Sequence, residues 1–279
     1  MLMLSVFIIA QEPADTSYWK KGGMGTATFS QVSFYQWAAG GENSYSTNGF
    51  LSLFANYKKE HISWDNTLGL GYGVIKQGSL TKKSDDRIDF SSMFGMEASK
   101  KWNYSALMGF KTQFAKGYNY PDKVHVISDF FAPAYLTTSL GMGYKPNDKF
   151  SLFLSPLTSK MTFVMDDTLS AAGAFGVEPG SKFRAEFGGY AKLSYIQEIM
   201  KNVSLQGKVD LFTNYLENPQ NIDVNAELML TMKINEFLAA TFSTMIIYDD
   251  DVTLLQSDGT NGPGLQVKEV FGVGLSYKF

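Results

Sequence analysis

The stretch Phe271-Gly272-Val273-Gly274-Leu275-Ser276-Tyr277-Lys278-Phe279 decides the fold. Apolar residues alternate with small or polar ones throughout this stretch, and its last residue is aromatic. Successive side chains of a β-strand point to opposite faces, so the apolar side chains here share one face. An apolar face that ends on a C-terminal aromatic residue is typical of the last strand of a transmembrane β-barrel.

The same two-residue period recurs along nearly the whole chain and predicts twelve strands. The expected strands are 24–35, 47–58, 61–75, 87–99, 102–114, 133–145, 149–164, 182–196, 203–215, 222–234, 236–248 and 267–279. In the first of these, Phe29 and Phe34 fall out of phase, which predicts a bulge or a register change. A helical period of 3.6 residues is nowhere sustained.

The expected connections between these strands alternate in length. Short turns are predicted at 58–60, 100–101, 145–148, 198–202 and 235–236, and longer loops at 36–46, 76–86, 115–132, 165–181 and 249–266, with a shorter one near 216–221. Outer-membrane barrels have short periplasmic turns and longer outer loops. The sequence therefore predicts an all-β, antiparallel, up-and-down transmembrane barrel of about twelve strands, with both termini periplasmic, in the cell outer membrane.

Aromatic residues near the short turns support this interpretation, because amphipathic rings favour the interface between membrane and water. The residues concerned are Tyr57, Trp64, Trp102, Tyr104, Tyr144, Phe150, Tyr195, Phe237, Tyr277 and Phe279. In a soluble barrel the same rings would belong to the core. A soluble β-barrel that binds a lipid is therefore the alternative at the level of the fold.

The composition excludes several classes of protein. The 279 residues contain 15% aromatic and 18% charged residues and no run of eighteen apolar ones, which excludes a membrane-spanning helix. The absence of cysteine excludes disulfides and thiolate metal sites. A net charge of −3 without a basic cluster gives no support for a nucleic-acid partner.

The N-terminal residues divide into two expected segments that precede the barrel. Residues 1–10 are apolar and resemble the end of a secretory signal peptide that is cleaved after Ala10, and the lack of a basic region predicts a start upstream of Met1. Residues 11–22 would form a periplasmic segment, and residues 23–279 a single outer-membrane barrel domain. A buried N-terminal strand is the alternative for the apolar run.

The polar face of the predicted strands would line the interior of the barrel. The candidate lumen residues are Asp65, Asp89, Glu97, Lys111, Arg184, Glu186, Lys192, Lys208, Asp210, Asp223, Glu227 and Lys233. Both signs of charge occur, so ion pairs between strands can brace the interior. A ring of one sign, which would indicate ion selectivity, is not seen. A barrel braced by its own side chains and a conducting pore therefore both remain open.

The sequence gives little support for catalysis or for a cofactor. Of its two histidines, His61 lies at a short turn, and His125 lies in a loop where the only conceivable catalytic set is His125 with Asp122 or Ser128. We therefore expect a protein that is not an enzyme, with no catalytic residue, no cofactor and no metal. The acidic groups Asp249-Asp250-Asp251 with Asp258, and Asp166-Asp167 with Glu178, could bind divalent cations, and solvated loops are the alternative.

The segment Ser30-Gln31-Val32-Ser33-Phe34-Tyr35-Gln36-Trp37-Ala38-Ala39-Gly40-Gly41-Glu42-Asn43-Ser44 resembles the signature of a domain-of-unknown-function family of β-rich outer-membrane proteins from Bacteroidota. The resemblance extends from about Trp19 to Phe279 and implies location and architecture, but no activity. Within the segment, Trp37, Gly40, Gly41 and Asn43 are expected to form a turn between the first two strands. A constriction of the lumen and a docking surface are the alternatives.

The leading hypothesis for function is a non-enzymatic envelope component or small-solute channel with a mixed-charge lumen. The alternatives are a barrel subunit of a larger outer-membrane assembly, with contacts through the first strand and the Trp37 turn, and an outer-membrane hydrolase. The expected partners are outer-membrane lipid, other outer-membrane proteins and the barrel-insertion machinery. Tyr277 and Phe279 would form the C-terminal signal for that machinery.

Overall fold

The computed structural model describes residues 17–36, 38, 41–255 and 259–279 and contains a closed antiparallel β-barrel. Its wall strands are β1 (Trp19–Val32), β2 (Ser44–Lys59), β3 (Ile62–Gln77), β4 (Leu80–Ser99), β5 (Trp102–Thr112), β8 (Ala134–Asn147), β9 (Phe150–Phe163), β10 (Phe183–Met200), β11 (Val203–Asn214), β12 (Asp223–Lys233), β13 (Leu238–Tyr248) and β16 (Gln266–Lys278). Neighbours in sequence pair along the wall, and β1 pairs with β16 to close it. The predicted fold and its number of strands are confirmed.

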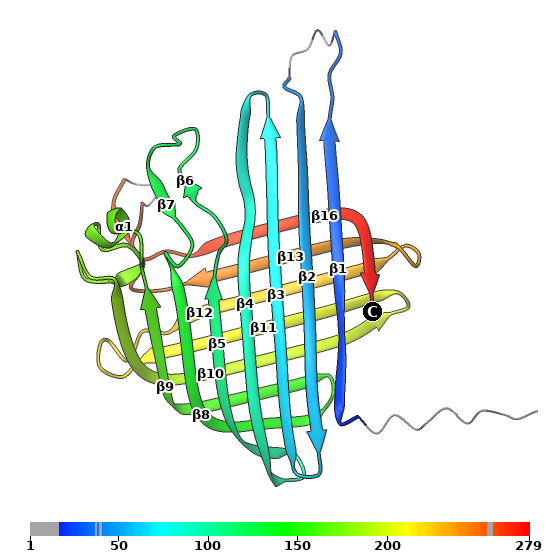
Figure 1. The fold of residues 1–279 in the computed structure, drawn as a ribbon, viewed down its shortest axis with the longest axis vertical. Coiled ribbons are helices and arrows are strands. Elements are labelled where there is room, and N and C mark those ends of the chain that lie inside the picture. The colour runs from blue at the N-terminus through cyan, green and yellow to red at the C-terminus, as the bar shows by residue number, and fades with distance from the viewer. Residues whose placement is uncertain (1–16, 37, 39–40, 256–258) are drawn as a thin grey trace, which may run out of the picture.

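The tilt of the strands is visible in Figure 1, where β1 to β4 of the near wall cross the strands of the far wall at a steep angle. Strands must tilt relative to the axis for a sheet to close into a barrel, so strands on opposite walls cross. Because the wall has an even number of antiparallel strands, the chain returns to the end of the barrel from which it starts. Both ends of the barrel sequence therefore lie at the end with the short turns, here named the turn end.

Two local predictions are wrong. The long loop expected at 76–86 is a two-residue turn, Gly78 and Ser79, because β3 and β4 continue to Gln77 and from Leu80. Gly78 has a φ of +56°, which a tight turn of this kind requires. The bulge expected near Phe29 is absent, since β1 pairs with β2 in one unbroken register from Trp19↔Tyr57 to Val32↔Ser44. Phe29 keeps the phase of Ala27, and Phe34 lies beyond the strand.

The start of the barrel also differs from the expected boundary. β1 begins at Trp19, so the last residues of the expected 11–22 periplasmic segment belong to the wall. The Trp19 ring lies 5.3 Å from that of Tyr57 and 5.8 Å from that of Trp64, measured between centroids. These rings tie the first strand to the β2–β3 hairpin. The predicted signal peptide and its cleavage site after Ala10 lie outside the described residues.

The opposite end of the barrel, here named the loop end, carries the longer connections. They contain the ribbons β6 (Gly117–Tyr118) with β7 (Val126–Ser128) and β14 (Leu254–Leu255) with β15 (Asn261–Gly262), together with the helices α1 (Asp167–Ala171) and η1 (Ala174–Gly176). Ala132, Val164, Leu169 and Val177 form a buried apolar cluster that joins the 113–133 and 164–182 loops. Of the helices in the described residues, none is long and apolar enough to cross a membrane.

The outer face of the wall is apolar and exposed. Along β16, for example, Phe271, Val273, Leu275 and Tyr277 are 46–67% exposed, while the residues between them point inward and are largely covered. Aromatic rings gather at the turn end, where Trp102 contacts Tyr144 at 4.9 Å between centroids. Others gather at the loop end, where Phe163 contacts Phe183 and Phe187 contacts Tyr215. Only a closed barrel satisfies every backbone group of a β-sheet in lipid. The protein is an outer-membrane β-barrel.

Candidate functional site

The interior of the barrel holds most of its ion pairs, and several of these join strands that are far apart in the wall. Arg87 Nη1 of β4 lies 2.9 Å from Glu227 Oε1 of β12. The two strands are separated by five others along either path around the wall, so this ion pair crosses the full width of the lumen.

Further contacts cross the lumen beside this pair. Lys111 Nζ of β5 lies 3.2 Å from Asp210 Oδ2 of β11, and Lys268 Nζ of β16 lies 2.5 Å from Asp85 Oδ1 of β4. Lys192 of β10 donates a hydrogen bond of 3.2 Å to the hydroxyl of Ser91 on β4. Charge-assisted contacts of this kind hold together strands that are not neighbours in the wall, and their side chains occupy part of the polar interior.

Lys160 of β9 is the centre of a buried charge cluster nearer the loop end. Its ammonium group lies 2.6 Å from Asp223, 3.4 Å from Asp249 and 3.7 Å from Glu186. The side chain of Glu186 is only 3% exposed. A buried carboxylate is tolerated when it is paired, and here the Lys160 ammonium group lies within 3.7 Å of all three carboxylates.

Arg184 of β10 connects the same cluster to the loops. Its guanidinium group lies 2.7 Å from Asp251 and 3.5 Å from Glu186, and it donates a 3.0 Å hydrogen bond to the backbone carbonyl of Gly176 in η1. Gly176 has a φ of +78°, which presents this carbonyl to the arginine without a side chain in the way. The cap formed by the 164–182 loop is therefore fixed to the barrel interior.

Aromatic rings also face the interior, although the sequence predicts a polar lining there. The guanidinium carbon of Arg87 lies 4.6 Å from the centroid of the Phe50 ring, and Lys160 Nζ lies 5.2 Å from that of Phe212. The Tyr190 hydroxyl lies 2.8 Å from Asp210 Oδ1. Cations over ring faces gain from the quadrupole of the ring, so these rings help to position the charges.

The remaining predicted lumen residues occupy different levels of the barrel. Asp65 lies 3.4 Å from Lys145, and Asp89 is the registered neighbour of Lys111 on the adjacent strand. Lys208 is the registered neighbour of Glu227. Two residues lie at the turn end instead: Glu97 bonds the ring of His61, and the exposed Lys233 ends β12.

Part of this charge network was not predicted from the sequence. Arg87, Lys160 and Lys268 lie on the polar face of their strands by simple alternation, so the same period that found the others could have found them. The sequence predicts Asp249 and Asp251 as cation-binding or solvated loop residues. They bond Lys160 and Arg184 instead, and among the described residues no group of acidic side chains or histidines has the geometry of a metal site.

The signature segment lies in the connection between β1 and β2. Trp37 and Gly40 lie outside the described residues. Asn43 links the two sides of the connection, because its side-chain oxygen accepts a 2.6 Å hydrogen bond from the Phe34 amide. Its backbone carbonyl accepts a hydrogen bond from the Gly78 amide, which ties the connection to the β3–β4 turn. Gly41 has a φ of +132° and packs under the Phe34 ring, where a Cβ atom would be 2.6 Å from the ring.

The two histidines lie at the ends of the barrel, outside the charge network. The Glu97 carboxylate, 2.8 Å from His61 Nδ1, raises the pKa of that imidazole through the hydrogen bond and its charge. His125 bonds Asp122 in an exposed loop, and the backbone amide of Val124 and this imidazole hold the pKa of the Asp122 carboxyl below its usual range. The hydroxyl of Ser128 lies over Gly117.

The C-terminus is anchored to the first strand. Gly23 and Phe279 exchange two backbone hydrogen bonds of 2.9 and 3.0 Å, and the Tyr277 and Phe279 rings stack with centroids 6.1 Å apart. Both rings are about 60% exposed at the turn end of the outer wall. The predicted insertion signal thus lies on the lipid-facing surface beside the strand that closes the barrel.

Comparison with known proteins adds a family likeness but no activity. Residues 29–118 match the family described as "Protein of unknown function (DUF3078)". No curated protein matches the chain. These residues run from the last part of β1 through β2, β3, β4 and β5, include the signature segment, and end in the ribbon after β5.

Several solved outer-membrane barrels resemble the chain at low identity. The translocator domain of the autotransporter NalP from Neisseria meningitidis has a TM-score of 0.38 and 10% identity, over 96% of this chain and 90% of that one. An outer membrane channel from Pseudomonas putida F1 has a TM-score of 0.40 and 12% identity, over 95% and 96%. The NanC porin has a TM-score of 0.40 and 6% identity, over 92% and 100%. TM-scores and identities this low carry no argument, so the fold is assigned from the closed twelve-stranded wall of the structure.

Proposed function

We propose that the protein is a non-enzymatic outer-membrane channel for small solutes, narrowed by side-chain pairs that cross its lumen. The observation that carries this proposal is the Arg87–Glu227 ion pair between opposite walls. Because charged side chains of both signs line the interior beside this pair, we expect weak selectivity between small anions and cations.

The geometry of the polar residues supports a role without catalysis. His125 and Asp122 form a pair on the outside of an exposed loop, where their side chains are 81% and 37% exposed. The buried carboxylates of the interior bond lysines or arginines, which leaves them unsuited to activate water or a nucleophile. Their arrangement fits a braced passage better than a reaction centre.

Single-channel recording in planar bilayers tests this function. The wild-type barrel should give small, resolved conductance steps, and the double variant Arg87→Ala/Glu227→Ala should raise the conductance at least about twofold because the pair no longer divides the lumen. Lys145→Ala/Asp65→Ala, which removes a 3.4 Å pair that does not span opposite walls, is the matched control and should change it less.

Two results would contradict the proposal. If neither the wild type nor the double variant conducts after folding is verified, the barrel is a closed envelope component. If the wild type conducts as a wide pore and the variant does not differ from it, the pair does not limit the passage.

We further propose a family, a route of assembly and contact surfaces for the barrel. The family likeness of residues 29–118 supports membership of the whole barrel in a family of outer-membrane proteins from Bacteroidota. Removal of residues 1–10 by signal peptidase, a periplasmic turn end, and insertion through recognition of Tyr277 and Phe279 complete the proposed path of assembly. Lipid contacts the apolar outer wall, and contacts with other outer-membrane proteins would use the β1–β2 connection.

A further inference from the structure

The seam between β1 and β16 is only partly paired. In the described residues, the two strands align over five residue pairs, from Met24↔Lys278 to Thr28↔Gly274. By comparison, the β1–β2 register runs over all fourteen residues of β1. Figure 1 shows the cause: β16 bends, and only its C-terminal part runs beside β1.

The bend leaves two strand edges without registered neighbours on the seam side. β1 continues to Val32 in register with β2 alone, and β16 from Gln266 to Val273 is in register with β13 alone. The next hydrogen-bonded positions in the register would be Phe29 and Val273. The registered pairing of β1 with β16 therefore ends at Thr28 and Gly274, and the two strand edges beyond it, unpaired with each other, are here named the opening.

This opening lies in the apolar part of the outer wall. Phe29, Phe271 and Val273 are 62%, 67% and 46% exposed and point away from the lumen. Backbone amides and carbonyls without partners are costly in hydrocarbon. An unpaired strand edge in the apolar part of the wall therefore favours the binding of a membrane molecule whose polar groups can hydrogen-bond the backbone.

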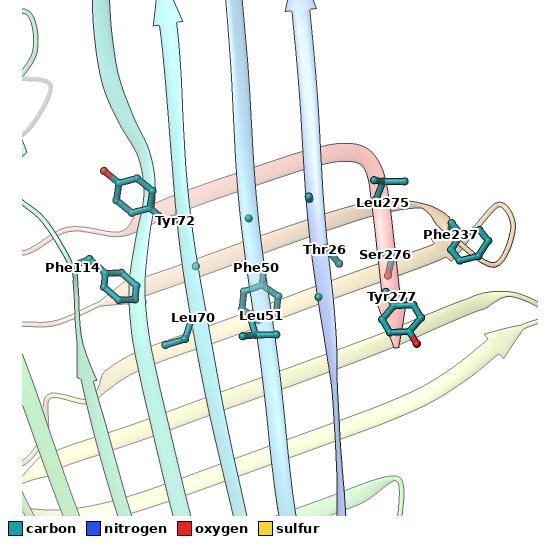
Figure 2. A pocket seen from close by; sticks show the side chains of 14 residues that line it. Thr26, Phe50, Leu51, Leu70, Tyr72, Phe114, Phe237, Leu275, Ser276 and Tyr277 are labelled. Atoms are coloured by element: carbon teal, nitrogen blue, oxygen red, sulfur yellow. The ribbon is translucent and has the colours of Figure 1, made fainter. Parts of the chain in front are cut away.

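An apolar groove begins at the paired part of the seam. It has a volume of about 750 Å³ and crosses the outer wall of β16, β1, β2 and β3. Tyr72 and Phe114 lie at one end of it, and Phe237 and Tyr277 at the other (Figure 2). Ala27 and Leu275, which are the last hydrogen-bonded pair of the seam, both line it, so the groove adjoins the opening.

The depth of the groove comes from small residues at positions where larger ones would fit. A Cβ atom on Gly25 would have no heavy atom within 4 Å, and one on Gly49 would meet only the Tyr72 carbonyl at 3.9 Å. Neither Gly25 nor Gly49 has a positive φ or a close backbone contact, so the backbone conformation allows a larger residue at both positions.

We infer that this groove binds an acyl chain of a membrane lipid, with the polar end of the lipid at the opening between β1 and β16. The groove is lined by apolar side chains and is surrounded by hydrocarbon, so an acyl chain is the occupant that the environment supplies. The ester and head groups of the lipid would lie farther along these edges, toward the exposed Gln31 of β1 and Glu269 of β16, and would hydrogen-bond the backbone there. The opening thus becomes a lateral lipid site in the barrel wall.

Filling the groove tests the inference in the intact barrel. Liposomes contain a phosphatidylethanolamine probe with a diazirine on one acyl chain, and adducts are mapped by mass spectrometry after irradiation. In the wild type, peptides that contain Leu51, Leu70 and Leu275 should carry adducts in excess over the rest of the outer wall. Gly25→Leu/Gly49→Leu should reduce these adducts at least about fivefold.

Gly207→Leu is the matched control, because Gly207 is an outward-facing strand glycine on the far wall whose Cβ atom would meet its nearest neighbour, Leu228, at 3.8 Å. It should leave the adducts at the groove unchanged, and a gel shift on heating verifies that all three proteins are folded. Adducts spread evenly around the barrel would overturn the inference, as would an unchanged pattern in Gly25→Leu/Gly49→Leu. A dimer with the seam protected in native mass spectrometry would assign the site to a second copy instead.

Discussion

Arg87 on β4 and Glu227 on β12 lie on opposite walls of the barrel, yet their side chains meet at 2.9 Å. Each side chain is only about one quarter exposed, so neither charge can be fully hydrated by the lumen alone. The Phe50 ring supports the guanidinium group from the β2 side. The pair thus acts as a cross-brace between two walls that share no strand neighbour.

Removing one member of this pair should destabilise the barrel more than removing both. Arg87→Ala leaves Glu227 without its cation in a partly buried site and should lower the free energy of unfolding by about 2 kcal/mol, less than the cost at a fully buried pair. The double variant Arg87→Ala/Glu227→Ala should recover more than half of that loss. Urea unfolding in detergent micelles, followed by tryptophan fluorescence, measures both. Equal losses in the single and double variants would show that the pair does not brace the walls.

The Lys160 cluster should be the most sensitive charged site of the interior. Lys160→Met leaves Glu186, Asp223 and Asp249 close together without their common cation. Loss of a buried partner costs about 3–5 kcal/mol, so we expect a loss at the upper end of this range. Adding Glu186→Gln to Lys160→Met should restore part of the stability. The same unfolding measurement checks this, and a double variant less stable than Lys160→Met would contradict it.

The fold of this barrel follows from the alternation of apolar and polar residues in the sequence. The pairing of its interior charges does not follow from that alternation. Alternation places Phe271, Val273 and Leu275 on one face whatever the rest of the chain does, because the period of a strand is fixed by the backbone. The number of strands and the turn end follow from the repetition of that pattern. The turn at Gly78 was not predicted because polar residues such as Lys76, Gln77, Lys82 and Lys83 continue β3 and β4, and apolar residues no longer alternate with polar ones there.

The partners of the interior charges depend on distances that a sequence does not contain. Which residue of β12 faces Arg87 is set by the tilt of the strands and by register shifts, such as those between Gly73 and Val74 and between Gly188 and Tyr190. The two residues are 140 positions apart in the chain. The inward aromatic rings Phe50 and Phe212 were likewise unexpected, because an aromatic residue in a barrel strand more often faces lipid.

At the turn end, the pair of His61 and Glu97 should make the imidazole titrate above its ordinary pKa of 6.5. The hydrogen bond and the charge of Glu97 favour the protonated ring in the folded state. This contribution to stability is present below about pH 6.5 and is lost as the pH rises through the folded pKa. An NMR titration of labelled histidine measures it, and Glu97→Gln should lower the pKa of His61. An unchanged His61 pKa in that variant, with His125 as the internal reference, would exclude the pair in solution.

The C-terminal ring should matter for assembly more than for the finished barrel. Phe279→Ala keeps the backbone bonds with Gly23 but removes the exposed ring that stacks on Tyr277. We expect at least about a fivefold drop in the amount inserted in cells and little change in the unfolding of barrels refolded from urea. Phe271→Ala, an equally exposed ring of the same strand, is the control and should insert normally. Equal losses for both variants would argue against a terminal signal.

The incomplete seam can be measured directly, because the chain contains no cysteine of its own. Ala27 and Leu275 face each other in the paired part of the seam, so Ala27→Cys/Leu275→Cys should form a disulfide readily. Phe29→Cys/Val273→Cys occupies the next positions of the same alignment, where β16 has bent away. It should form a disulfide at least about tenfold more slowly under the same mild oxidant, as judged by gel mobility. Similar rates for the two pairs would mean that β16 closes fully against β1 in the membrane, and a lateral opening would then be excluded.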